Sequence, residues 1–219
     1  MSAMPDSVDQ FSAKGLSAPA KVDPRHTAVL VVDMENDFCV EGGAMVLPGY
    51  EKLIGPQLRV IETARKAGSP IVFITDAHRP GVHRDREFLK RDRHCIEGTW
   101  GAQVVDALKP LPDDHYVIKR RYSGFFGTDL DMTLKDMEVD SVVVMGVVTN
   151  ICVRSTVHDA FFLGYRVFVP EDCVAAPSQR EQISSLFDIA TSFGWVTDSR
   201  EVANAYDTGS RIDNRFEFA

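Results

Sequence analysis

Short apolar runs alternate with amphipathic stretches along most of this 219-residue chain. Six of these runs, rich in valine, isoleucine and phenylalanine, have the length and composition of buried strands. We predict strands at 27–34, 70–76, 115–121, 141–148, 166–172 and 194–198. Because near-continuous apolar strands separated by helices are typical of a parallel sheet covered on both faces, the pattern predicts an α/β fold. We expect a three-layer sandwich with a central six-stranded, mainly parallel sheet of Rossmann-like topology.

Helical periodicity and end signals occupy the gaps between these runs. We predict helices at 50–68, 128–137, 150–164 and 178–193. Thr128 is the expected N-cap of the second helix, and Ser178 with Glu181 forms a capping-box pattern at the start of the fourth. The alternation indicates one domain at 26–206. Polar segments flank it, and we expect a flexible arm at 1–25 and a C-terminal tail at 207–219.

Composition narrows the function classes. The chain is 44% hydrophobic and 26% charged, with a formal net charge of -8. A nucleic-acid-binding protein usually presents a basic face, so the acidic balance argues against that class. One basic cluster, "HRDREFLKRDRH" at 83–94, is interrupted by acidic residues. It is typical of a solvated surface rather than of a polyanion-binding site.

The chain also lacks signals for membrane insertion or export. No apolar run is long enough to span a membrane, and the first residues do not form a signal-peptide pattern. We therefore expect a cytoplasmic location, where thiols stay mostly reduced. The four cysteines form no C-x-x-C pair or zinc-ribbon spacing, and they are Cys39, Cys95, Cys152 and Cys173.

Reactive side chains stand where several predicted strands end. Asp33 ends the first strand, Asp76 and His78 end the second, and Lys119 ends the third. Cys152 follows the fourth strand after a short turn. In open parallel sheets the ligand crevice lies beyond the carboxyl ends of the strands. We therefore expect these side chains to converge at one edge of the sheet.

Two interpretations of this edge remain open. In the catalytic one, the start of a helix and Lys119 lower the pKa of the Cys152 thiol, while Asp33, its pKa raised by burial, exchanges the proton. In the structural one, Asp33 and Lys119 form an ion pair and Cys152 is a small buried hydrophobe. A buried ion pair without a use is costly, and the turn "GVVTNIC" places backbone N–H groups beside the sulfur. Both observations favour catalysis.

Four segments carry a family resemblance. "LVVDMENDF", "KRRYSGFFGTDLD", "GVVTNICV" and "DAFFLGYRVFVPED" resemble the isochorismatase-like cysteine hydrolases, in the family's order and across about 26–205. That family includes nicotinamidases, N-carbamoylsarcosine amidohydrolases and ureidoacrylate amidohydrolases. The resemblance implies that Asp33, Lys119 and Cys152 are the catalytic residues. It also implies a cis peptide bond between Val147 and Val148, with the Val148 and Cys152 amides forming an oxyanion hole.

The resemblance implies an activity as well. A cysteine in this position favours hydrolysis of a C–N bond in a small linear amide, carbamoyl or ureido compound, through a thioester and with release of ammonia. No cofactor is required for that core chemistry. The implied partner is a small-molecule amide, and the family suggests a homodimer or homotetramer. A catalytically silent member acting as a binding protein is the alternative from another class.

A metal is a further possibility. Nicotinamidases in the family bind a divalent metal through an Asp-x-His pair and a later histidine, which here are Asp76, His78 and His94. Zn²⁺ suits such ligands. Because "DAHRPG" also resembles members without a metal, a metal-containing nicotinamidase stands as the second enzyme hypothesis. We expect His158 to be a surface or core histidine rather than a ligand.

The substrate pocket is the least determined feature. The segments at 119–131 and 186–198 resemble ureidoacrylate amidohydrolases, whereas "HCIEGTWGA" resembles nicotinamidases. Arg120 and Arg121 are candidates for pairing with a substrate carboxylate. The candidate substrate-binding residues are the asparagine that follows Glu35, which is Asn36, together with Phe38, Trp100, Tyr122, Phe125 and Phe126.

Overall fold

The computed structural model describes residues 18–82 and 85–216. Its helices are α1 (Asn36–Cys39), α2 (Glu51–Lys66), α3 (Leu130–Asp136), α4 (Arg154–Phe162), α5 (Gln179–Asp188) and α6 (Ser199–Thr208). Its strands are β1 (Ala20–Lys21), β2 (Thr27–Val32), β3 (Ile71–Asp76), β4 (His115–Lys119), β5 (Ser141–Val147), β6 (Arg166–Pro170), β7 (Val174–Ala175), β8 (Trp195–Thr197) and β9 (Arg211–Ile212).

The central sheet has the order β4-β3-β2-β5-β6-β8, with β7 pairing beside β5. Every pairing between its strands is parallel. All six predicted strands are therefore present, but the sheet has seven strands rather than six. The additional strand, β7, is only two residues long, and so short a segment produces no apolar run in the sequence.

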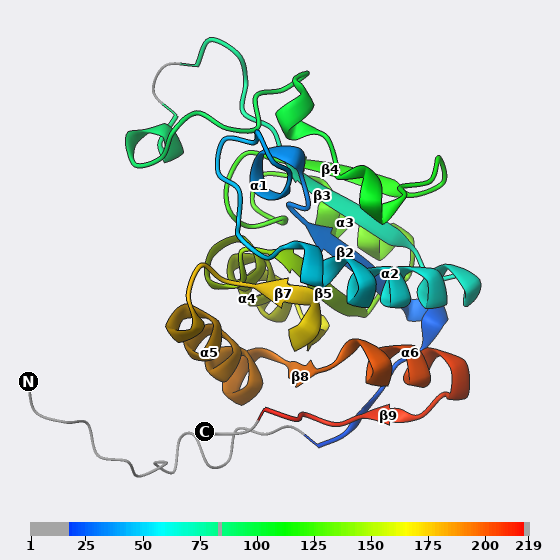
Figure 1. The fold of residues 1–219 in the computed structure, drawn as a ribbon. Coiled ribbons are helices and arrows are strands. Elements are labelled where there is room, and N and C mark those ends of the chain that lie inside the picture. Colours follow the sequence, from blue (N-terminus) through cyan, green and yellow to red (C-terminus); the bar gives the residue numbers. More distant parts are fainter. Residues whose placement is uncertain (1–17, 83–84, 217–219) are drawn as a thin grey trace, which may run out of the picture.

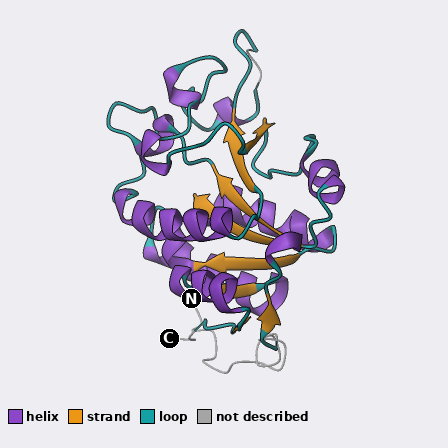
Figure 2. Ribbon diagram, turned by 90° about the vertical axis from the view of Figure 1, so that its right-hand side faces the viewer, coloured by secondary structure: helices purple, strands orange, loops and turns teal. Residues whose placement is uncertain are grey.

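Helices cover both faces of this sheet, as the apolar strands predicted. In Figure 1, α2 and α6 lie in front of the sheet and α3 and α4 lie behind it. The view turned by 90° in Figure 2 shows the same three layers. Every residue of β2, β3 and β5 is buried, which explains why these strands lack the polar alternation of a sheet with one solvated face.

Two elements lie in or near segments that were expected to be irregular. A second, two-stranded sheet pairs β1 with β9 antiparallel, so chain from both expected flanking segments lies side by side. Its Ile212 is fully buried. The helix α6 was not predicted, although Asp198 caps it by accepting from the amides of Arg200 and Glu201, and Gly209 ends it in the left-handed region.

Helix starts differ from the prediction in detail. The Ser178 cap of α5 is confirmed, since its side chain accepts from the Glu181 amide. At α3 the N-cap is Asp129 rather than Thr128, although the Thr128 hydroxyl accepts from the Leu130 amide at 3.3 Å. The predicted third helix begins with a π-helical turn, Thr149–Val153, before α4.

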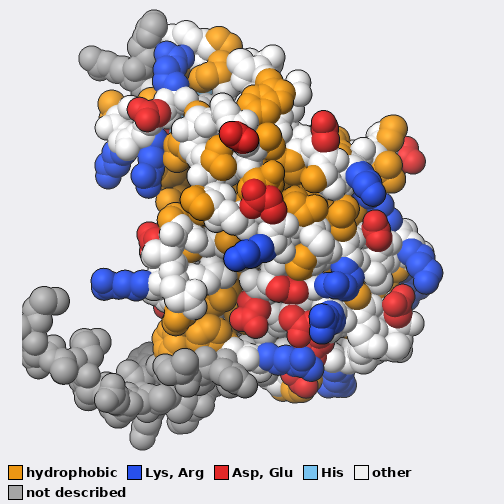
Figure 3. Space-filling model, viewed as in Figure 1, with side chains coloured by type: hydrophobic (Ala, Val, Ile, Leu, Met, Phe, Trp, Pro, Cys, Tyr) orange, Lys and Arg blue, Asp and Glu red, His pale blue; other side chains and the backbone are white. Residues whose placement is uncertain are grey.

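The charge pattern and the helix lengths bear on two function classes that the sequence argued against, which are nucleic-acid-binding proteins and membrane-spanning proteins. On the face shown in Figure 3, acidic and basic side chains are interspersed over most of the described surface. Among the described residues, no helix combines the length and apolarity that a bilayer crossing needs.

Candidate active site

The three predicted catalytic residues lie at the carboxyl ends of three strands of the central sheet. Asp33 directly follows β2, Lys119 ends β4, and Cys152 lies in the turn after β5. Asp33 has φ 52°, a left-handed conformation that is rare for residues other than glycine and that often marks functional sites. Gly146 allows β5 to approach β2 closely here, because a Cβ at that position would lie 1.9 Å from the Val32 carbonyl oxygen.

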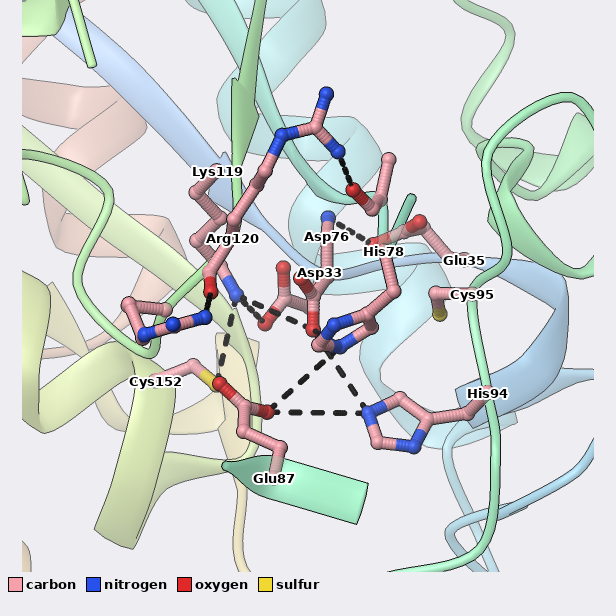
Figure 4. Close-up of polar contacts among 12 residues, drawn as sticks. Asp33, Glu35, Asp76, His78, Glu87, His94, Cys95, Lys119, Arg120 and Cys152 are labelled. Atoms are coloured by element: carbon pink, nitrogen blue, oxygen red, sulfur yellow. Dashed lines mark hydrogen bonds and ion pairs between the residues drawn. The ribbon is translucent and has the colours of Figure 1, made fainter. Parts of the chain in front are cut away.

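Lys119 connects the other two residues. Its Nζ lies 2.9 Å from Asp33 Oδ2 and 3.8 Å from Cys152 Sγ. Figure 4 shows the ammonium group between the carboxylate and the sulfur. Asp33 is 1%, Lys119 0% and Cys152 9% exposed. The geometry therefore combines both interpretations. Asp33 and Lys119 form the buried ion pair of the structural interpretation, and Lys119 also contacts the Cys152 thiol, as the catalytic one requires.

The electrostatics of the site indicate whether Cys152 or Asp33 holds the proton before the reaction. Burial raises the pKa of Asp33 to about 6, although the Lys119 ammonium opposes this rise. Burial also raises the pKa of the Cys152 thiol well above its usual range, despite Lys119. The expectation of a lowered thiol pKa was wrong, because desolvation outweighs both the lysine and the turn. At neutral pH the arrangement holds a protonated thiol beside an ionised carboxylate.

Backbone contacts position the nucleophile. The Val147–Val148 peptide bond is cis, as the resemblance implied. The Val148 carbonyl accepts from the Ile151 amide at 3.1 Å and from the Val153 amide at 3.3 Å, which closes the turn that carries Cys152. The buried Thr156 hydroxyl donates to the Cys152 carbonyl at 2.8 Å and accepts from the Gly124 amide at 3.0 Å. It thus ties the segment after Lys119 to this turn.

A second buried cluster adjoins the first. Asp76, His78, Glu87 and His94 each offer one ligand atom, and these atoms all lie within 4.8 Å of one another. Asp76 Oδ2 lies 3.2 Å from His78 Nε2 and 3.8 Å from Lys119 Nζ, so the clusters touch. Figure 4 shows the four side chains pointing toward one another.

The donor set of this second cluster fits a divalent cation. Among the described residues, His78 Nε2, Asp76 Oδ1 and Glu87 Oε1 are buried and make no hydrogen bond, although His78 Nε2 lies 3.2 Å from Asp76 Oδ2. A metal ion would satisfy such atoms. His78 Nδ1 contacts Asp85 Oδ2 at 2.8 Å, which leaves Nε2 directed at the cluster. Two imidazoles and two carboxylates are ligands that zinc accepts.

Both clusters border one small cavity of about 210 Å³. Asp33 and Cys152 line it from the first cluster, and Asp76, Glu87 and His94 line it from the second. Its volume lies below the roughly 300–1,000 Å³ of pockets for drug-sized ligands, so it suits a small substrate. Apolar groups supply much of the remaining wall, and they include Phe38, Met45, Val46, Leu47, Pro48, Ile151 and Pro177.

The predicted substrate-binding residues separate into two groups. Phe38 and Tyr122 line the cavity. Asn36 instead donates its side-chain amide to the Trp100 carbonyl at 2.8 Å, and Trp100 is 48% exposed. Phe125 packs in the core against Tyr165.

The remaining candidates lie outside the cavity. Phe126, Arg120 and Arg121 line a separate surface hollow. Arg120 donates to the Ala77 carbonyl, and Arg121 donates to the Arg120 carbonyl. His158 lies on α4 and stacks on Phe193, in agreement with its expected structural role.

Sequence reasoning missed Glu87 and Arg91, which both line the cavity. They belong to the basic cluster 83–94, which was interpreted as a solvated surface. A carboxylate between His78 and His94 was the one available signal for Glu87. Wall residues 45–48 carried no chemical signal, since their place depends on how the loop after α1 folds back.

Comparisons with known proteins agree with this geometry. The isochorismatase domain family matches residues 27–201. Ureidoacrylate amidohydrolase RutB of Cronobacter sakazakii is 37% identical over 208 residues, which cover 83% of this chain and 89% of the relative.

Solved structures are similar as well. N-carbamoylsarcosine amidase from Thermoplasma acidophilum is 38% identical with a TM-score of 0.72, covering 80% of this chain and 97% of that one. Pyrazinamidase of Pyrococcus horikoshii, in complex with zinc, is 30% identical with a TM-score of 0.74, covering 79% of this chain and 99% of that one. The chain belongs to the isochorismatase family, as one of its amidohydrolases, which act on carbon–nitrogen bonds other than peptide bonds.

Proposed function

We propose that this chain is a cysteine-dependent amidohydrolase that cleaves a small linear ureido or carbamoyl compound and releases ammonia. The observation that carries the proposal is the position of Lys119, which touches both Asp33 and Cys152 at the wall of a small cavity. The similarity to a ureidoacrylate amidohydrolase and to an N-carbamoylsarcosine amidase supports this substrate class.

The proposed reaction begins with proton transfer from Cys152 Sγ to Asp33. Sulfur bonds to the carbonyl carbon, and the resulting oxyanion is held by the Val148 and Cys152 amides, with the Lys119 charge nearby. The C–N bond then breaks as Asp33 gives its proton to the leaving nitrogen, which departs as ammonia. Water, deprotonated by Asp33, cleaves the C–S bond, and the proton returns to the thiol.

The test is ammonia release from a panel of ureido acids, carbamoyl amino acids and simple amides. Cys152→Ala should reduce kcat by at least about 10⁴-fold, as loss of a catalytic nucleophile does. Cys173→Ala is the matched control, because Cys173 is also buried but does not line the cavity. Activity that survives in Cys152→Ala would refute the covalent mechanism.

A metal-containing nicotinamidase is the second candidate, and the unpartnered atoms of Asp76, His78 and Glu87 favour it. These residues and His94 would hold a divalent ion such as Zn²⁺, which when bound supplies a Lewis acid for a lone pair of the substrate. Elemental analysis together with nicotinamide turnover distinguishes the candidates. A homodimer or homotetramer stays a prediction for light scattering.

A further inference from the structure

The catalytic cavity is rich in carboxyl groups, but a cation stands at its wall. Asp33, Asp76 and Glu87 all line it. Within the described part of the chain, Arg91 is the one lining side chain with a permanent positive charge. An anionic group on a substrate would be attracted to this guanidinium, because opposite charges lower the electrostatic energy.

Arg91 is positioned toward the cavity by its own segment. It follows the 3₁₀ turn Glu87–Leu89, and its amide donates to the Glu87 carbonyl at 3.0 Å. Basic side chains gather on this projecting segment, at the upper left of Figure 3. Tyr122 lines the same cavity, and although burial raises the pKa of its hydroxyl, the Arg91 charge opposes that rise.

The Arg91 guanidinium is available to a ligand. Within the described residues, no hydrogen bond or ion pair engages it. The neighbouring arginines are already engaged, since Arg93 lies over the Phe88 ring at 5.4 Å and Arg120 pairs with Glu97 at 3.2 Å. Arg91 is also exposed, so pairing it with an anion carries a small desolvation cost.

We propose that Arg91 is the specificity-determining residue that binds a carboxylate at the far end of the substrate from the scissile C–N bond. The inference rests on the proposed function and narrows its substrate class to small ureido or carbamoyl acids. Arginine suits this role because its planar guanidinium binds a carboxylate with two parallel hydrogen bonds. Much of the lining shared by Arg91 and Cys152 is apolar, which suits a short hydrocarbon linker.

The test compares 3-ureidopropionate with propylurea, which has the same three-carbon chain but no carboxylate. The wild type should prefer the acid in kcat/KM. Arg91→Gln should lower the value for the acid about ten- to a hundredfold, as expected for hydrogen bonds to a charged group, and that for propylurea much less. The kcat/KM of Arg91→Lys for the acid should lie between those of the wild type and Arg91→Gln, because lysine retains the charge but lacks the planar guanidinium. Arg93→Gln is the control and should preserve the preference.

Binding to the Cys152→Ala protein, measured by calorimetry, separates recognition from turnover. Loss of affinity for the acid when Arg91→Gln is added supports the inference, even if no compound is hydrolysed and the proposed function fails. An equal effect of Arg91→Gln on acid and propylurea, or no preference for the acid in either assay, overturns the inference and leaves the amidohydrolase proposal standing.

Discussion

The two buried clusters that meet at the cavity handle charge in different ways. The first pairs the Asp33 carboxylate with its own cation, Lys119, at 2.9 Å. The second places Asp76 and Glu87 beside two histidines, and burial raises the pKa of Glu87 to about 7. The first cluster is therefore electrostatically complete within the chain, whereas the second relies on titratable groups and on a longer contact of Asp76 with the same lysine, at 3.8 Å. The first cluster can therefore hold its charge without a ligand, whereas a cation that binds the second would compete there with protons.

Removing the internal cation should produce the largest change in the first cluster. Lys119→Met leaves the buried Asp33 and Asp76 carboxylates without their shared partner, at a cost of about 3–5 kcal/mol in the free energy of unfolding. We expect kcat to fall about 10²- to 10³-fold, as it does when one electrostatic donor is lost. Urea denaturation and ammonia release measure the two effects.

The control for this variant is an exposed lysine. Lys135→Met breaks only the surface pair with Asp131, which is worth roughly 0.3–0.5 kcal/mol. The double variant Asp33→Asn, Lys119→Met should recover part of the lost stability because it removes both charges. A Lys119→Met protein as stable as the wild type would contradict the account of a complete first cluster.

Supplying a cation should stabilise the fold through the second cluster. Zn²⁺ at 100 times its dissociation constant should raise the free energy of unfolding of chelator-treated protein by about 2.7 kcal/mol. The variant Glu87→Gln should lose most of this gain, whereas Cys152→Ala should keep it. Thermal unfolding with and without the ion measures the effect. Equal stabilisation of wild type and a His78→Ala, His94→Ala variant would show that the ion binds elsewhere.

Titration of Asp33 should give a smaller effect that links the clusters. Asp33 must be ionised to accept the thiol proton, and its pKa is raised to about 6. In metal-free enzyme, kcat/KM should therefore rise with pH as this carboxyl group loses its proton. At pH 5 the value should be roughly a tenth of its plateau. A cation beside Asp76 should move this limb to lower pH, since negative charge on Asp76 is one cause of the raised pKa. A flat profile from pH 5 to 8 would exclude Asp33 as the base.

The same contrast explains what sequence could and could not predict. Asp33, Asp76 and Lys119 follow directly from the strand ends, because the carboxyl ends of parallel strands share one edge. Glu87 and Arg91 come from a long irregular segment, whose path depends on tertiary contacts rather than on local periodicity. The raised pKa of Cys152 was missed for a related reason, since burial is a property of the folded surroundings.

Short or locally weak elements limited the prediction of the fold in the same way. The six longer strands are visible as apolar runs, but β7 has two residues and depends on Gly146 and Val147 of β5 for its pairing. The helix α6 carries an N-cap signal at Asp198, yet it follows β8 without an intervening loop. Packing against α2 stabilises this helix, and no local sequence pattern indicated that contact.

The smallest expected effect concerns Thr156, whose hydroxyl connects the segment after Lys119 with the turn that carries Cys152. Thr156→Val keeps the side-chain shape but removes the hydroxyl that bridges the Gly124 amide and the Cys152 carbonyl, so the buried Gly124 amide loses this acceptor. We expect kcat to fall roughly fivefold, which corresponds to about 1 kcal/mol of lost transition-state stabilisation, while KM changes little. Thr156→Ser, which retains the hydroxyl, should restore most of the activity. If the bridge only supported the fold, both variants would change stability without this kcat difference. Zinc binding should be unchanged in either variant, because neither Gly124 nor the Cys152 carbonyl touches the second cluster.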